Sequence, residues 1–118
     1  MMQTDYRVHT ASKEKLMQDV PTEIDCDLAV KCIDNSMMNA RIFSGDIVFI
    51  KEQAEINNGA VVAVQVDDTI MIRRIYHYND RIELRPENPT IKVMNFEGEQ
   101  MSGVKIIGKA VGFMSTTI

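Results

Sequence analysis

The stretch Asn35-Ser36-Met37-Met38 poses the first chemical question of this sequence, because Ser36 is either a nucleophile or a polar residue near a turn. A serine hydroxyl is a poor nucleophile until a neighbouring base takes its proton. A lysine can be that base when an apolar environment disfavours its charged form and lowers its pKa. The role of Ser36 therefore depends on which basic residue the rest of the chain places beside it.

The apolar pattern around Ser36 predicts short strands joined by turns. Alternation over 26–32 predicts a half-buried strand, and the even spacing of Cys26 and Cys32 predicts both thiols on one face without a bridge between them. Ser36 is placed to cap a short helical turn. Further apolar runs predict strands over 47–50, 60–66, 69–75, 81–84 and 104–114.

Turn-forming residues separate these runs. They are Gly45-Asp46, the hairpin-type Asn57-Asn58-Gly59, Asp67-Asp68, Asn79-Asp80 and the loop Pro86–Pro89. Gly108 and Gly112 predict bends or bulges within the last strand. About six to eight short strands with little helix are typical of an all-β sandwich or barrel-like domain.

Composition limits the classes of function. The 118 residues suit one domain with a modest core, and the pattern divides them into an N-terminal arm or linker end over 1–25 and a folded domain over 26–118. A net charge of −4 argues that this chain does not bind DNA by itself. No apolar run approaches the roughly 18 residues of a membrane helix, and no signal peptide is evident, so a cytoplasmic location is expected. His9 and His77 match no metal spacing, and no metal or cofactor is expected.

Several motifs occur in a fixed order along the chain. They are Asn35-Ser36-Met37, Ser44-Gly45-Asp46-Ile47-Val48, Asn58-Gly59-Ala60-Val61-Val62, Ile72-Arg73-Arg74-Ile75, Leu84-Arg85-Pro86-Glu87-Asn88 and Gly108-Lys109-Ala110-Val111-Gly112. In this order the chain resembles, over about residues 26 to 114, the C-terminal domain of the LexA and phage-repressor family, the S24-type self-cleaving serine peptidases. The resemblance implies a mostly β fold, shared with signal peptidases, of several short, coiled antiparallel strands with little helix.

The resemblance also implies a serine–lysine dyad, and here the chain departs from the family. Ser36 matches the nucleophile, but the position of the general-base lysine, 37 residues later, holds Arg73. An arginine with a pKa above about 12 does not lose its proton in a protein, so Arg73 cannot accept the proton of Ser36. Arg73 is expected instead to pair with a carboxylate such as Asp34 or Asp46, and Arg74 to lie at the surface on the other face.

A second departure concerns the bond that family members cut. They cleave an Ala-Gly or Cys-Gly bond upstream of the serine, whereas the first glycine here is Gly45. The chain is then a piece of a larger repressor, the product side of a cleavage, or a member of a lineage that lost both base and cleavage site. Whether Met1 is a native start stays open, as does whether the N-terminal arm covers the Ser36 cleft.

The leading interpretation is a dimerising, regulatory C-terminal domain of a phage- or prophage-type repressor with a degraded self-cleavage site. The expected partners are a second copy, through the last strands over 104–114, and DNA only through a separate helix-turn-helix domain. A RecA-type co-protease of the SOS response is a further expected partner. The alternatives are an active S24-type autopeptidase that uses Ser36, and a UmuD-like polymerase accessory subunit.

Three smaller expectations accompany this interpretation. Met37 and Met38 either line a peptide groove or pack in the core. Pro86-Glu87-Asn88 is assigned turn geometry and no chemistry. A signal-peptidase relative would need a membrane anchor, which no segment of this sequence provides.

Overall fold

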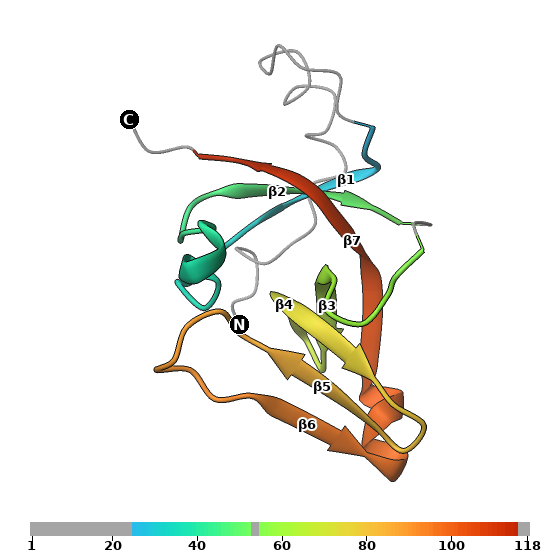
Figure 1. Ribbon diagram of the computed structural model, residues 1–118. Coiled ribbons are helices and arrows are strands. Elements are labelled where there is room, and N and C mark those ends of the chain that lie inside the picture. The colour runs from blue at the N-terminus through green and yellow to red at the C-terminus, as the bar shows by residue number, and fades with distance from the viewer. Residues whose placement is uncertain (1–24, 53–54, 116–118) are drawn as a thin grey trace.

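A single antiparallel sheet organises the computed structural model, which describes residues 25–52 and 55–115 (Figure 1). The sheet has seven strands in the order β1-β2-β7-β3-β4-β5-β6. They are β1 (Leu28–Lys31), β2 (Ile47–Lys51), β3 (Val61–Val66), β4 (Thr69–His77), β5 (Arg81–Arg85), β6 (Met94–Glu97) and β7 (Val104–Met114). Two 3-10 helices, η3 (Met38–Ala40) and η4 (Gly98–Gly103), complete the elements. The predicted mostly β fold is confirmed.

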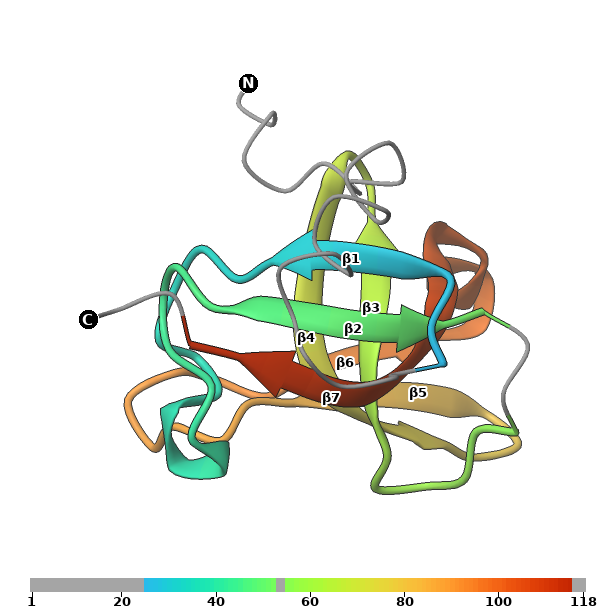
Figure 2. The same cartoon turned by 90° about the horizontal axis from the view of Figure 1, so that it is seen from above.

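Strand β7 links the β1–β2 part of the sheet to the β3–β6 part. Its C-terminal half pairs with β2 and its N-terminal half with β3, and the register shifts once in each ladder, next to Gly112 and next to Gly108. Such bulges bend a strand and increase its twist. As a result β1, β2 and β7 run across β3 and β4, which places the two halves of the sheet face to face (Figure 2). The bulges predicted from the two glycines are present.

The apolar core lies on both faces of β3. On one face, side chains of β1, β2, β3 and β4 pack together, and Met37 and Ile42 from the connection between β1 and β2 join them. On the other face, β3, β4 and β5 form a second cluster, which Met94 and Phe96 of β6 partly cover. Burial of this apolar area is what stabilises a sheet folded over itself. The first cluster lies beside the turn that carries Ser36.

Two sequence expectations about the order and number of strands need correction. The turn at Asn57-Asn58-Gly59 does not close a hairpin, since β7 lies between β2 and β3. Strand β6, with only four residues before η4, was not predicted. By contrast, the Asp67-Asp68 and Asn79-Asp80 turns do join the β3–β4 and β4–β5 hairpins.

The first strand also differs from the prediction. β1 covers only four residues, and Leu28, Ala29 and Val30 are all buried, so it is not half-exposed. Cys26 packs with Ala29 and Phe49, whereas Cys32 packs with the opposite cluster. The prediction that both thiols share one face is therefore wrong, because the period-two pattern ends with the short strand. Both thiols are buried and form no disulfide with each other.

Two further expectations concern the N-terminal arm and membrane-spanning helices. The N-terminal arm or linker end predicted over 1–25 lies, except for Asp25, outside the described residues. Across residues 25–52 and 55–115, no helix has both the length and the apolar character needed to cross a membrane.

Candidate active site

The fold brings Ser36 and Arg73 into direct contact. Ser36 follows β1, Arg73 lies within β4, and an Arg73 Nη1 donates a hydrogen bond of 2.7 Å to Ser36 Oγ. The same nitrogen donates to the carbonyl of Ile72 at 2.8 Å. Ser36 is 1% exposed and Arg73 is 7% exposed, so the contact is shielded from solvent. The two residues that the sequence singled out therefore form one buried pair.

The backbone of Ser36 is also held on both sides. Its N–H donates to Asp34 Oδ1 at 3.0 Å, and its carbonyl accepts from the N–H of Glu87 at 2.7 Å. Together with the contact from Arg73, every polar atom of Ser36 has a hydrogen-bond partner inside the chain. A group held in this way is fixed in position before any ligand arrives.

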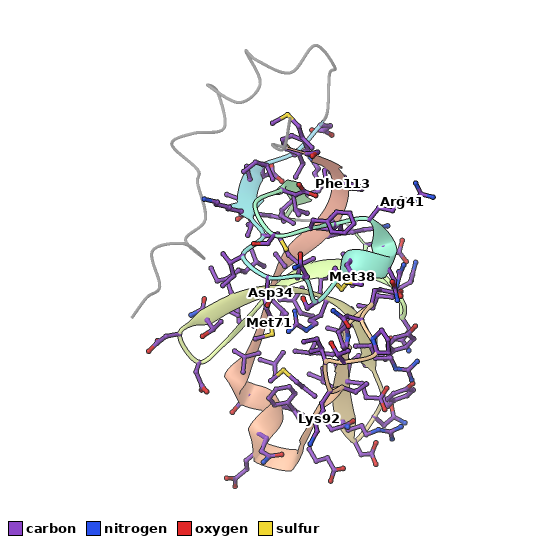
Figure 3. All side chains as sticks on the ribbon, turned by 90° about the vertical axis from the view of Figure 1, so that its left-hand side faces the viewer. Asp34, Met38, Arg41, Met71, Lys92 and Phe113 are labelled. Carbon is purple, nitrogen blue, oxygen red and sulfur yellow. The ribbon has the colours of Figure 1, made fainter. Side chains whose placement is uncertain are left out.

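Ser36 is not a helix cap. Helix η3 begins at Met38, its N-cap residue is Met37, and no side chain caps it. The side chain of Ser36 instead points into the protein towards Arg73. Met37 is fully buried in the first core cluster, while Met38 is 41% exposed (Figure 3). The two methionines thus divide between the core and the surface.

The carboxylates expected to neutralise Arg73 make other contacts. Asp34 accepts from the N–H of Ser36, and Asp46, which is 1% exposed, accepts from the N–H of Phe43 at 2.9 Å. Among the contacts described here, the Arg73 guanidinium reaches the Ser36 hydroxyl instead of either carboxylate. Both acidic side chains therefore stabilise the turn around Ser36.

Cys32 lies in the same environment but has no nucleophilic character. Burial is the main reason that the pKa of its thiol is raised, and the charge of Arg73 opposes this only in part. The thiol donates a hydrogen bond of 3.2 Å to the carbonyl of Asp34. Because the thiolate is the reactive form, a raised pKa leaves Cys32 an inert core residue.

Arg74 is not the free surface residue that alternation predicted. Its Nε donates to the Glu87 carboxylate in a short ion pair, and its Nη1 donates to the carbonyl of Gly59 at 2.6 Å. Its side chain is only 34% exposed. Sequence periodicity places Arg74 on the opposite face from Arg73 but gives no information on what it contacts there.

The loop after β5 contacts the Ser36 turn directly, which the sequence did not indicate. Besides the Glu87 contact, the carbonyl of Glu87 accepts from the N–H of Asn39 at 2.9 Å, and Asn88 Nδ2 donates to the carbonyl of Asn35 at 2.9 Å. Prolines at 86 and 89 signal a loop, but not its partner 50 or so residues away. The loop belongs to the site.

Among the hydrogen bonds within the described residues, the side chain that reaches Ser36 Oγ is that of Arg73 and not that of a lysine. Lys51 pairs with Asp25 at 3.2 Å at the far end of β2. Lys92 is exposed, and Figure 3 shows it well away from Asp34. A protonated guanidinium can donate to the Ser36 oxygen but cannot accept its proton. The geometry therefore has a nucleophile position without a proton acceptor of the lysine type in the described part of the chain.

A narrow space adjoins the pair. Strand β4 pairs with β3 from Thr69 to Arg74 but with β5 only from Arg74 onwards, so within the described residues one edge of 69–73 has no strand beside it. This edge faces the segment 31–34, and between them lies a cavity of about 10 Å³. Figure 3 shows Asp34 and Met71 next to each other at this place. The space holds about one water molecule.

Comparisons with known proteins identify the family and relatives of this chain. A model of the Peptidase S24-like family matches residues 3–111. The chain is 42% identical over 86 residues to the LexA repressor of Thermosipho melanesiensis, covering 73% of this chain and 42% of that protein. It is 37% identical over 83 residues to the LexA repressor of Thermotoga maritima (70% and 41% covered) and 32% identical over 108 residues to that of Bordetella petrii (87% and 47% covered). The chain spans less than half the length of these relatives.

Proposed function

The chain belongs to the Peptidase S24-like family, and from this we propose that it is the regulatory C-terminal domain of a LexA-like repressor, of phage or prophage type, that does not cleave itself. The observation that carries the proposal is the buried hydrogen bond of 2.7 Å from Arg73 to the Ser36 hydroxyl. It places a permanent proton donor where self-cleavage needs a proton acceptor.

The chemistry of Ser36 and Arg73 supports a catalytically inactive site. A serine that attacks a peptide bond must transfer its proton as the new bond forms. Arg73 is charged at every physiological pH and occupies a lone pair of Ser36 Oγ, which lowers the nucleophilicity of that oxygen. A RecA-type co-protease would accordingly have no self-cleavage to trigger in this domain.

Dimerisation is the function that remains when catalysis is lost. Ile106, Val111 and Phe113 of β7 are between 37% and 43% exposed, which is unusual for large apolar side chains on a central strand. A second copy packed on this strand would cover them and form a two-fold dimer. Two copies would then place two DNA-binding heads on neighbouring half-sites.

The negative net charge of the chain supports the assignment of DNA binding to a separate domain. With a net charge of −4, the domain is poorly suited to neutralise phosphates. DNA contact is therefore assigned to a separate helix-turn-helix domain in the half of the protein that the relatives have in addition. The proposed location is the cytoplasm, where such a repressor meets its operator.

Cleavage in trans tests the proposal. The parent chain and its Arg73→Lys variant are each mixed with a peptide that carries an Ala-Gly bond, and intact mass is followed for hours at neutral and mildly alkaline pH. We expect the parent to be inactive and the variant to cut at least a hundredfold faster, because a buried lysine can lose its proton.

The control for this experiment is Ser36→Ala in the Arg73→Lys background, which should abolish cleavage. Cleavage by the parent chain that disappears in Ser36→Ala would overturn the proposal, and would make this protein a working autopeptidase.

A further inference from the structure

Two consecutive arginines of β4 are linked to the Ser36 turn, Arg73 directly and Arg74 through Glu87. Arg73 reaches the side chain of Ser36, while Arg74 reaches Glu87, whose backbone N–H donates to the carbonyl of Ser36. Alternation along a strand sends their side chains to opposite faces. The Ser36 turn is thus held from both faces of β4 by separate contacts.

The loop that carries Glu87 holds the turn at three points. The Glu87 N–H donates to the carbonyl of Ser36 at 2.7 Å, and the Glu87 carbonyl accepts from the N–H of Asn39 at 2.9 Å. The third bond runs from Asn88 Nδ2 to the carbonyl of Asn35 at 2.9 Å. All three bonds depend on where the loop lies relative to β4. Arg74 sets that distance, because it joins the Glu87 carboxylate to the carbonyl of Gly59 at the start of β3.

We propose that Arg74 and Glu87 are positioning residues for Ser36, and that they fix its backbone whatever residue occupies position 73. The proposal rests on the proposed function only in regarding Ser36 as the former nucleophile. A nucleophile displaced by about 1 Å can lose a hundredfold in rate. The pair would then hold the backbone of Ser36 in place independently of the side chain at position 73.

The exposure of the pair separates positioning from general stability. The two side chains are 34% and 31% exposed, and ion pairs so open to water contribute little to global stability. Loss of the pair should therefore loosen the turn locally without shifting the thermal unfolding midpoint. A contact that only stabilises the fold as a whole would instead lower the unfolding midpoint without a separate local effect on the turn.

Amide hydrogen exchange, measured by NMR on the whole chain, tests this inference. The N–H groups of Asn39 and of residue 87 form hydrogen bonds between the loop after β5 and the Ser36 turn. In Glu87→Ala both N–H groups should exchange at least tenfold faster, with an unchanged unfolding midpoint. The matched control is Glu83→Ala, which removes the ion pairs of Glu83 with Arg85 at 2.7 Å and with Arg81 at 3.9 Å in the same hairpin but leaves the Arg74–Glu87 pair in place. That control should leave both exchange rates unchanged.

Coupling between the two positioning residues gives a second readout. Arg74→Met should accelerate the same amides, and Arg74→Met/Glu87→Ala should be no faster than the faster single variant. Unchanged exchange in Glu87→Ala, equal acceleration in Glu83→Ala, or fully additive effects would each overturn the inference.

A catalytic readout is added in the Arg73→Lys background. If that variant cleaves, adding Glu87→Ala should lower kcat about tenfold with KM little changed, while adding Glu83→Ala should not. If Arg73→Lys does not cleave, the expectation of a restored site fails, and the exchange rates alone decide the role of Arg74 and Glu87.

Discussion

Arginine and lysine differ most where a proton must be given up. At position 73 either residue can lie beside Ser36, but only lysine has a pKa that burial can bring near neutrality. The planar guanidinium uses one nitrogen for both Ser36 Oγ and the carbonyl of Ile72. A lysine at this position could act as a base, whereas the arginine present is a fixed hydrogen-bond donor.

The Cys32 thiol gives a prediction at the same scale. Burial raises its pKa above the ordinary value of 9.0. A backbone hydrogen bond with Asp34 and the charge of Arg73 oppose this rise, and the negative charges of Asp34 and Asp46 add to it. The native state therefore holds this proton more tightly than the unfolded chain does. Its contribution to stability is complete below the unfolded pKa and is lost as the pH rises through the raised value.

We therefore expect the free energy of unfolding to fall more steeply above pH 9 in the parent chain than in Cys32→Ala. Urea unfolding at several pH values between about 7 and 10.5 measures this difference in slope. Other groups that titrate in this range are common to both proteins and cancel in the comparison. Equal slopes would contradict the assigned pKa shift.

At the scale of elements, β7 holds the fold together, and Gly108 is the residue on which its path depends. A Cβ at this position would lie 2.6 Å from Ile50 Cγ2 and 2.6 Å from the carbonyl oxygen of Lys51. Contacts this close with backbone cannot be relieved by a rotamer change. The absence of a side chain at Gly108 lets β7 approach the end of β2 closely.

Gly108→Ala should accordingly destabilise the protein by about 2–3 kcal/mol, as overpacked positions do. The measurement is the urea midpoint. Gly103→Ala is the matched control, since a Cβ there meets nothing within 4 Å and its stability should change by less than about 0.5 kcal/mol. A similar loss in both variants would show that the close approach at β7 is not the cause.

At the scale of the whole molecule, the proposed dimer should depend on the exposed apolar side chains of β7. Phe113, which is 43% exposed, lies near the end of that strand. Phe113→Asp places a charge where a second copy would pack, and should weaken dimerisation at least tenfold in sedimentation velocity experiments.

Val93→Asp is the matched control for the dimer. Val93 is similarly exposed, at 45%, but lies in the loop before β6 instead of on β7. Its substitution should leave the dimer intact. A parent chain that is monomeric at high concentration, or equal effects of both substitutions, would exclude β7 as the interface.

Residue patterns alone determined much of this protein. The order of the motifs indicated the family, and the family model confirms it. Apolar periodicity located six of the seven strands. The family resemblance placed Arg73 at the general-base position for Ser36, and the two side chains are in contact. These features are readable because strand periodicity, turn chemistry and the proton affinity of a side chain are local properties.

Only the tertiary structure decided how the site is held. Strand β7 lies between β2 and β3 instead of a hairpin joining them, since long-range pairing is set by which apolar faces can be buried together. The same fold places Glu87 on the carbonyl of Ser36 and Asp34 on its N–H. Polar partners of this kind are chosen by proximity in space, so the sequence determined the chemistry of Ser36 and Arg73, and the fold determined what holds them.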